Sequence, residues 1–181
     1  LRSHGINKLN DKPINIKNAF TNNKLNQWYY EMRELGYHYR ITDIQCALGI
    51  SQLEKLKKIL SYKKEVFKRY DKAFKNIENI SILQKEKRNN TSYHLYLVKF
   101  NFKKMNKDRQ SLLEFLQKNN IITQVHYIPV VYHPYYEKKF NKEKFPNAIN
   151  YYEGCLSLPC YFNYSKKDQN FVIKKIIEFI S

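Results

Sequence analysis

The chain has 181 residues, of which 43% are hydrophobic and 27% are charged. This length and apolar content allow a folded core and exclude a disordered tail. The formal net charge of +17 is compatible with a nucleic-acid or anionic-membrane partner. The lysines are scattered over the sequence, however, which favours solvated helix faces and loops over a nucleic-acid-binding patch.

The cysteines and the apolar runs indicate the cellular compartment of the protein and exclude some kinds of site. Cys46, Cys155 and Cys160 have no metal-ligand spacing and are odd in number, so the sequence predicts neither a metal site nor a disulfide framework. A reducing, cytoplasmic compartment fits these thiols best. No apolar run approaches the roughly 20 residues of a membrane span. The chain begins without methionine, and we expect it to be a segment of a longer protein.

Residues 1–35 show little periodicity. An aromatic group, Trp28, Tyr29 and Tyr30, lies within a mixed and polar stretch. This composition predicts loops that lie over another surface.

A polar, aromatic turn then leads into a long helix. Tyr37, His38, Tyr39 and Arg40 bring rings and positive charge to the residues before that helix. The N-terminus of a helix is a natural seat for a phosphate or another anion, so the turn is a candidate ligand site. The alternative is that these side chains only pack against and solvate a corner of the fold.

The helix itself is expected from Thr42 to about Asn76. Thr42 is placed as an N-cap, Gln45 completes a capping box, and Asp43 lies in the positive first turn. Apolar residues then recur at helical spacing. At 1.5 Å per residue the helix would be about 50 Å long, which is typical of a helix that bridges two domains.

Beyond residue 80 the pattern is that of a small α/β layer. Alternating aromatic and branched residues predict strands, and amphipathic spacing predicts helices. We expect residues 156–159 to form a short extended turn into a surface loop, and Ser165 or Asp168 to cap the last helix. The expected elements are strands at 93–102 and 121–128 and helices at 108–118, 145–155 and 167–180.

The sequence contains no motif for a self-contained catalytic site. The four glycines form neither a GxGxxG nor a P-loop pattern, and there is no nucleophile elbow. A second group of rings lies in TQVHYIPVVYHP, where His126 and Tyr127 follow an alternating stretch that Pro129 ends. Such a histidine is either a hydrogen-bonded structural residue or a ligand. Two groups of histidine with aromatic residues in one chain favour a ligand site.

Several motifs of the chain carry a resemblance to a known family. They are RSHG at 2–5, WYYEMRELGYHYRITDIQCALGISQLEKL at 28–56, TQVHYIPV at 123–130, HPYY at 133–136 and YYEGCLSLPCY at 151–161. Together they resemble the C-terminal half of the pyridoxal-phosphate-dependent DegT/DnrJ/EryC1/StrS nucleotide-sugar aminotransferases. Within this family they are most similar to members that act in pseudaminic acid synthesis. The resemblance covers essentially the whole chain, in order.

The resemblance implies an α/β fold, namely the C-terminal portion of a fold-type I aminotransferase. Residues 1–56 would be a remnant of the large cofactor-binding domain with an interface turn. Residues 57–80 would be the connecting helix, and residues 81–181 the small C-terminal α/β domain. In the family the lysine that forms a Schiff base with the cofactor precedes the RSHG motif. That lysine would fall before Leu1, so we expect no catalytic residue in this chain and no activity from the chain alone.

The resemblance also implies a cofactor, pyridoxal 5'-phosphate, and the residues that bind it. In family homodimers the turn before the long helix reaches the cofactor phosphate of the neighbouring subunit. That role falls on His38, which stands where many members have asparagine, and on Arg40. His126 and Tyr127 match the start of the family's HYxPxH motif and are expected on the substrate side, whereas Val131 replaces the second histidine of that motif.

The implied reaction transfers an amino group from glutamate to C4 of a UDP-4-keto-6-deoxy-N-acetylhexosamine. Two alternatives stay open. The first alternative is that the chain is a truncated sugar-nucleotide-binding module, or a fragment that complements a separately made N-terminal half. Alternatively it is a basic nucleic-acid-binding protein, which the interleaved lysines and aromatic residues allow and the lack of a recognisable binding motif opposes. The expected partners include neither nucleic acid nor membrane.

Overall fold

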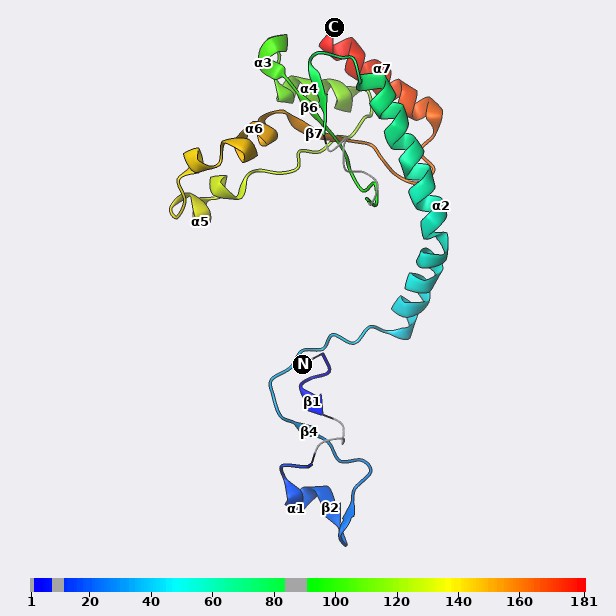
Figure 1. The fold of residues 1–181 in the computed structure, drawn as a ribbon, viewed down its shortest axis with the longest axis vertical. Helices are drawn as coiled ribbons and strands as arrows, with labels where there is room; N and C mark the ends of the chain where they lie inside the picture. Colours follow the sequence, from blue (N-terminus) through cyan, green and yellow to red (C-terminus); the bar gives the residue numbers. More distant parts are fainter. Residues whose placement is uncertain (1, 8–11, 84–90) are drawn as a thin grey trace. The chain divides into compact units, whose positions relative to one another are not determined.

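The computed structural model describes residues 2–7, 12–83 and 91–181. It divides into two compact units, Leu1–Glu54 (unit 1) and Lys55–Ser181 (unit 2), which are described separately below (Figure 1). The division into three domains made from the sequence stays a prediction. None of the helices in the described ranges combines the length and the apolar character that a membrane span requires.

Before the long helix that begins at Asp43, unit 1 consists of short elements joined by turns. Asn22 and Asn23 have φ angles of 49° and 58° and form the two-residue turn of a hairpin. Asparagine tolerates this left-handed conformation, which the favoured type I′ hairpin turn requires. The elements are helix α1 (Ile16–Ala19) and two antiparallel strand pairs, β1 (Ile6–Asn7) with β4 (Glu31–Met32) and β2 (Phe20–Thr21) with β3 (Lys24–Leu25).

Helix α2 spans Asp43–Phe74, as the sequence predicts for this region. The expected capping box is present, because the Thr42 backbone N–H donates to Gln45 Oε1 at 3.0 Å and the Gln45 N–H donates to Thr42 Oγ1 at 3.3 Å. These bonds satisfy donors that the first helical turn leaves free. The helix ends at Phe74, and a strand begins at Ile80.

Unit 2 is built on an antiparallel sheet with the strand order β5-β6-β7. Val98 in the middle strand lies opposite Ile82 on one side and Leu156 on the other. Tyr96, Val98 and Phe100 are buried in alternation along that strand, because successive side chains of a strand point to opposite faces. The strands are β5 (Ile80–Ile82), β6 (Tyr96–Phe100) and β7 (Cys155–Leu158).

Helices cover and extend this sheet. The Asp108 carboxylate caps α4 (Arg109–Lys118) by accepting from the Ser111 N–H at 2.8 Å, and Ser165 Oγ caps α7 (Lys166–Ile180) by accepting from the Asp168 N–H at 3.0 Å. The structure confirms the helices that the sequence predicts at 108–118, 145–155 and 167–180, because it has helices at Arg109–Lys118, Pro146–Gly154 and Lys166–Ile180. The elements are α3 (Phe102–Met105), α4 (Arg109–Lys118), α5 (Pro134–Glu137), α6 (Pro146–Gly154), α7 (Lys166–Ile180) and the 3-10 helices η2 (Val130–Tyr132) and η3 (Lys142–Lys144).

Two sequence expectations in unit 2 are wrong. Residues 121–128 do not form a strand, because Gln124 makes only an isolated bridge to Ser157. The neighbouring Ile122 and Tyr127 are 78% and 71% exposed, and no other residue of the segment pairs with a strand in the described part of the chain. Residues 156–158, which were expected in a turn, belong to β7. Leu156 and Leu158 are members of the hydrophobic core, so this part of the chain is not a surface loop.

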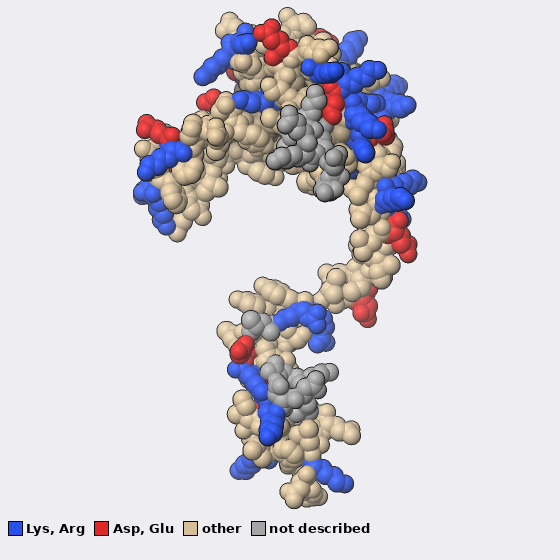
Figure 2. Space-filling view, in the orientation of Figure 1, with Lys and Arg blue, Asp and Glu red and all other residues tan. Residues whose placement is uncertain are grey.

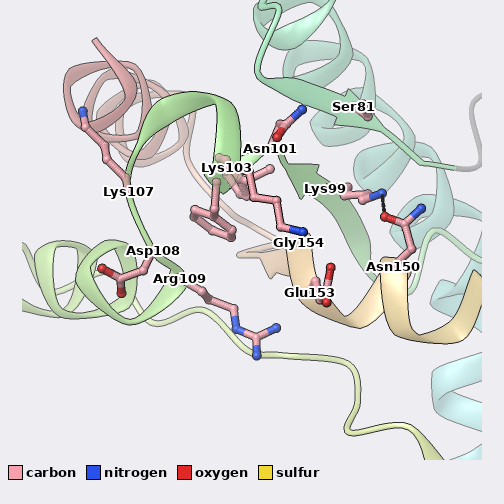
Figure 3. A pocket seen from close by; sticks show the side chains of 12 residues that line it. Ser81, Lys99, Asn101, Lys103, Lys107, Asp108, Arg109, Asn150, Glu153 and Gly154 are labelled. Carbon is pink, nitrogen blue, oxygen red and sulfur yellow. Dashed lines mark hydrogen bonds between the residues drawn. The ribbon is translucent and has the colours of Figure 1, made fainter. Parts of the chain in front are cut away.

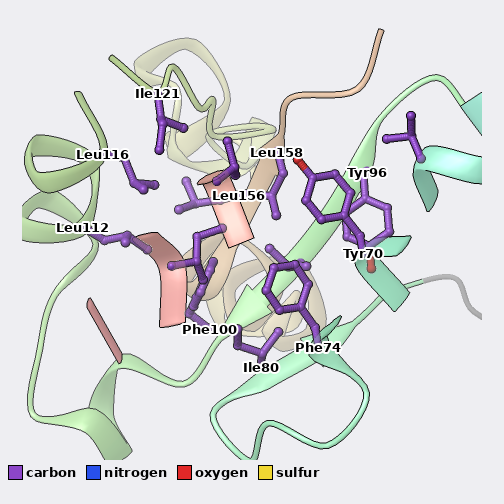
Figure 4. Packing of buried hydrophobic residues seen from close by; sticks show 14 of the residues in the cluster. Tyr70, Phe74, Ile80, Tyr96, Phe100, Leu112, Leu116, Ile121, Leu156 and Leu158 are labelled. Carbon is purple, nitrogen blue, oxygen red and sulfur yellow. The ribbon is translucent and has the colours of Figure 1, made fainter. Parts of the chain in front are cut away.

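The core of unit 2 lies between α2, the sheet, α4 and α7 (Figure 4). Rings and branched side chains fill it, and two tyrosine hydroxyls within it are satisfied. Tyr70 donates to the Pro159 carbonyl at 3.0 Å, and Tyr96 donates to Asp71 Oδ1 at 2.8 Å. Members of the core that are fully buried include Val66, Tyr70, Tyr96, Val98, Leu112, Leu116, Leu156 and Ile176.

The basic side chains are distributed and do not form a single patch on the face that Figure 2 shows. Lys and Arg lie along α2 and over both units, with Asp and Glu among them. This distribution agrees with solvated helix faces, as the scattered lysines of the sequence indicate.

Candidate functional site

The first motif of the chain, RSHG, pairs with the turn that precedes α2. The His4 N–H donates to the Tyr37 carbonyl at 2.9 Å. Ser3 and His38 form an isolated antiparallel bridge. Two segments that lie more than thirty residues apart in the sequence are thus joined through their backbones.

Two glycines make this pairing possible. A Cβ atom on Gly36 would lie 2.0 Å from the Gly5 nitrogen, and a Cβ atom on Gly5 would lie 1.8 Å from the Glu34 carbonyl oxygen. Gly5 also has a φ of +68°, in the left-handed region that favours glycine. No other residue type permits the two backbones to approach so closely.

A cavity of about 320 Å³ lies beside the paired segments and is called the Arg40 cavity here. Arg40 Nη2 donates to Ser3 Oγ at 3.5 Å. His38, the other residue predicted to bind the cofactor, does not line the cavity, but its ring meets the His4 ring edge-on at 4.9 Å between centroids. The cavity is lined by Ser3, His4, Ile6, Tyr30 and Arg40.

The donors of the Arg40 cavity fit a phosphate. A guanidinium forms strong charge-assisted hydrogen bonds with phosphate oxygens, and Arg40 is exposed enough to do so. The Ser3 hydroxyl, which already accepts from Arg40, has a proton that it can donate to the same anion. This donor set matches the phosphate end of pyridoxal phosphate.

A carboxylate network holds the strand next to this cavity. Glu31 accepts from the backbone N–H groups of Ile14 at 2.9 Å and Asn15 at 2.7 Å, and from the Tyr29 hydroxyl at 2.9 Å. It also forms an ion pair with Arg33 at 3.0 Å. These bonds, first of all that from Ile14, lower the pKa of Glu31 from 4.5 to about 2. Residues 14–15 are thereby tied to β4.

The second predicted pair, His126 and Tyr127, lies in unit 2 and has two very different environments. His126 is 7% exposed, and its Nε2 lies 2.8 Å from Ser157 Oγ. Tyr127 is 71% exposed. The two rings meet edge-on at 4.5 Å between centroids. Tyr127 is therefore available to a ligand, whereas the His126 ring is enclosed by the protein.

Another cavity of unit 2, of about 430 Å³, shares no lining residue with the predicted sites (Figure 3). Three of the cations that line it already have acceptors within the chain. Lys99 Nζ donates to Asn150 Oδ1 at 2.7 Å, and Lys107 and Arg109 donate to backbone carbonyls. Positive lining alone therefore does not mark it as an anion site.

The described ranges contain no group of three or more His, Cys, Asp or Glu side chains that could hold a metal ion. The hydrogen-bond donors of the Arg40 cavity and the exposed Tyr127 are thus the features that the predicted site residues offer to a ligand.

Comparison with known proteins assigns the family. The model of the DegT/DnrJ/EryC1/StrS aminotransferase family matches residues 1–177. The chain belongs to this family. Its members are pyridoxal-phosphate-dependent sugar aminotransferases, so the cofactor expected from the sequence is confirmed at the level of the family.

Individual relatives agree with this assignment. The spore coat polysaccharide biosynthesis protein SpsC of Bacillus subtilis is 36% identical over 99% of the chain and 45% of its own length. The UDP-4-amino-4,6-dideoxy-N-acetyl-beta-L-altrosamine transaminase of Campylobacter jejuni is 36% identical over 95% of the chain and 41% of its own length. The chain thus spans less than half the length of the curated relatives it matches.

A solved structure confirms the fold. PseC of Helicobacter pylori, an aminotransferase involved in the biosynthesis of pseudaminic acid, superposes with a TM-score of 0.81 at 27% identity. The match covers 99% of the chain and 44% of the PseC chain. The chain is therefore a portion of the aminotransferase fold, as the resemblance implies.

Sequence reasoning missed several residues of the candidate sites. Ser3 and His4 belong to a motif that was recognised but given no role, and Tyr30 was seen only as part of an aromatic group. Ser157 was assigned to a turn. A polar residue between Leu156 and Leu158 is the signal that could have marked it, because a buried polar group requires a partner.

Proposed function

We propose that this chain is part of a pyridoxal-phosphate-dependent nucleotide-sugar aminotransferase and that the Arg40 cavity contacts the phosphate of the cofactor. The observation that carries this proposal is the pairing of the RSHG motif with the turn before α2, which gathers Ser3, His4 and Arg40 around one cavity. The family assignment favours this function over nucleic-acid binding.

The residues of the cavity would bind and orient the phosphate. Arg40 supplies a fixed positive charge and several donors, and Ser3 supplies a hydroxyl at 3.5 Å from the guanidinium. His38 would act through its contact with His4 or by a donated hydrogen bond of its own. When bound, pyridoxal phosphate supplies the electron sink that amino transfer needs.

The proposed substrate is a UDP-4-keto-6-deoxy-N-acetylhexosamine, and the proposed amino donor is glutamate. The printed name of the Campylobacter jejuni relative, a transaminase of a UDP-linked dideoxy sugar, supports this substrate class. His126 and Tyr127 would form part of the substrate side, with Tyr127 exposed to meet it. The net charge of +17 would attract the diphosphate of such a substrate.

We further propose a homodimeric, cytoplasmic enzyme whose sites are completed across the subunit interface, and a chain that does not transaminate by itself. None of its lysines lies in the family's Schiff-base motif. Treatment of the chain with pyridoxal phosphate and borohydride should therefore give no stoichiometric lysine adduct by mass spectrometry. A single modified lysine at full occupancy would contradict this part of the proposal.

Binding of the cofactor phosphate can be tested directly on the chain. Side-chain NMR signals of Arg40 and His4 should shift on titration with pyridoxal phosphate or inorganic phosphate, but not with pyridoxal, which lacks the phosphate. Arg40→Ala should weaken phosphate binding at least about tenfold, which corresponds to about 1.4 kcal/mol. Lys24→Ala, which removes one positive charge from the same unit, is the matched control. Equal shifts with pyridoxal, or binding that Arg40→Ala leaves unchanged, would refute the assignment.

A further inference from the structure

His126 is the buried histidine of this chain. All five histidines lie in the described ranges, and the other four are exposed. Its Nε2 lies 2.8 Å from Ser157 Oγ, whereas its Nδ1 is enclosed and has no hydrogen-bond partner among the described residues. A neutral imidazole has one donor nitrogen and one acceptor nitrogen. The position of its proton therefore depends on what Ser157 does.

The Ser157 hydroxyl has one proton and two neighbours. Its Oγ lies 3.3 Å from the Gln124 carbonyl oxygen as well as 2.8 Å from His126 Nε2. A carbonyl can only accept, so the bond to Gln124 uses the hydroxyl proton. The hydroxyl oxygen then accepts from the imidazole, which requires the proton of the neutral ring to be on Nε2.

The opposite arrangement is less favourable. If Ser157 donated to Nε2, the ring proton would be on Nδ1 and the bond from Ser157 to Gln124 would be lost. Both arrangements leave Nδ1 without a partner among the described residues, so they differ by that one bond. Buried polar groups are satisfied wherever the geometry allows, and the geometry here favours the Nε2–H form.

We propose that Ser157 is a positioning residue that holds the neutral His126 ring in its Nε2–H form, and that this ring positions Tyr127 for contact with the substrate. This inference rests on the proposed function, in which this pair faces the nucleotide sugar. The fixed imidazole meets the Tyr127 ring edge-on at an interplanar angle of 77°. Tyr127, which is 71% exposed, then presents a hydroxyl that can donate to or accept from a sugar hydroxyl or a phosphate.

In this arrangement His126 does not itself contact the substrate. Its free nitrogen is enclosed and its other nitrogen is engaged by Ser157. The bridge between Gln124 and Ser157 fixes the backbone on which the ring is carried, through Ser157 N–H to Gln124 O at 2.9 Å. Ser157 and His126 therefore act together, and Tyr127 is the member of the group that a ligand can reach.

The tautomer can be measured on the unmodified chain. With ¹⁵N-labelled histidine rings, long-range ¹H–¹⁵N spectra distinguish a protonated from an unprotonated ring nitrogen. We expect the His126 signal, identified by its loss in His126→Gln, to show a protonated Nε2 and an unprotonated Nδ1 at pH values where the ring is neutral. A protonated Nδ1 would overturn the inference.

Variants test the role of Ser157. Ser157→Ala should give a mixture of both tautomers and should change the ring-current shifts of Tyr127, and Ser157→Thr, which keeps the hydroxyl, should restore the wild-type signals. Ser181→Ala, which removes an exposed hydroxyl, is the control and should change neither. If Ser157→Ala folds, as its amide spectrum would show, and keeps a pure Nε2–H ring, the inference is wrong.

Titration with UDP-N-acetylglucosamine separates this inference from the proposed function. Shifts of the Tyr127 ring signals that exceed those of His126, and weaker binding by Tyr127→Phe, would support both. Shifts confined to His126 would overturn the assignment of Tyr127 as the contact. A chain that shows the expected tautomer but does not bind this probe would count against the proposed function and would leave the relation between Ser157 and His126 supported.

Discussion

The two compact units of this chain are ordered by different interactions. Unit 2 encloses a core in which side chains such as Tyr96 and Leu156 are fully buried. In the described residues of unit 1 only Gly5 and Ala19 are buried, while Leu35 is 88% exposed. Hydrophobic burial is the main source of folding free energy. Unit 2 therefore has its own source of stability, and unit 1 depends on backbone pairing and on the Glu31 carboxylate.

This difference is instructive for function, because the predicted cofactor residues lie in the unit without a core. A phosphate site there is held by hydrogen bonds and by glycine contacts, which are local and each of modest energy. The predicted substrate pair lies in the unit with the core, where His126 is fixed by burial.

The largest expected effect is a cavity in the core of unit 2. Leu156→Ala should lower the free energy of unfolding by about 3 kcal/mol, within the usual range of 2–5 for buried leucine. The matched change in unit 1, Leu35→Ala, should alter it by about 0.5 kcal/mol or less, because the side chain is already in solvent. Urea unfolding followed by circular dichroism measures both. Equal losses would show that unit 1 has a core of its own.

The next effect is steric and concerns unit 1. Gly36→Ala places a Cβ atom 2.0 Å from the Gly5 nitrogen, so the RSHG motif and the turn before α2 should separate. We expect the amide protection of His4 to fall by about tenfold or more, which corresponds to about 1.4 kcal/mol, and phosphate binding to fall with it.

Gly49→Ala is the matched control for this substitution. A Cβ atom on Gly49 meets no atom within 4 Å, and alanine should stabilise helix α2 by about 0.5–1 kcal/mol. Retained His4 protection in Gly36→Ala would show that the two backbones stay paired despite the added Cβ atom, and would contradict the role given to the two glycines.

A third effect depends on pH. The pKa of Glu31 is lowered from 4.5 to about 2, so its contribution to the order of unit 1 is fully present above pH 4.5. That contribution should be lost as the pH falls through the range down to about 2. Hydrogen exchange at the Ile14 and Asn15 amides should show protection at pH 4 and loss of it near pH 2.

Glu31→Gln should remove this pH dependence, because an amide oxygen carries no charge to titrate. The amide signals of β6 in unit 2 provide an internal reference within the same sample. If protection at Ile14 and Asn15 were independent of pH in the wild-type chain, the carboxylate would not hold this segment.

The smallest effects concern helix caps. Ser165→Ala removes the cap of α7, whose Val172 and Ile176 are buried in the core, and should cost about 1 kcal/mol of unfolding free energy. Thr42→Ala removes the cap of α2 in unit 1 and should only increase exchange in its first turn. If Thr42→Ala lowered the urea midpoint as much as Ser165→Ala, the two units would unfold as one.

Much of the local structure could be predicted because its causes are local. Thr42, Asp108 and Ser165 stand at the starts of helices and make the capping bonds that their residue types favour. The segment 121–128 alternates as a strand does, yet it failed to become one, since only Gln124 finds a partner on β7. A strand requires a neighbouring segment with free hydrogen-bonding groups. The neighbouring segment here is β7, which lies about thirty residues further along the sequence.

The sequence by itself determined the long capped helix, the helices of unit 2, the family and the residues worth testing, because capping boxes, helical periodicity and contiguous motifs act over a few residues. Only the tertiary structure decided which residues meet. It brought Gly5 against Gly36, placed Ser3 beside Arg40 and joined Ser157 to His126. It also buried the His126 side chain and left the Tyr127 side chain exposed, although the two residues are adjacent in sequence. Burial and hydrogen-bond partnership depend on chain segments far apart in sequence, and no local pattern encodes them.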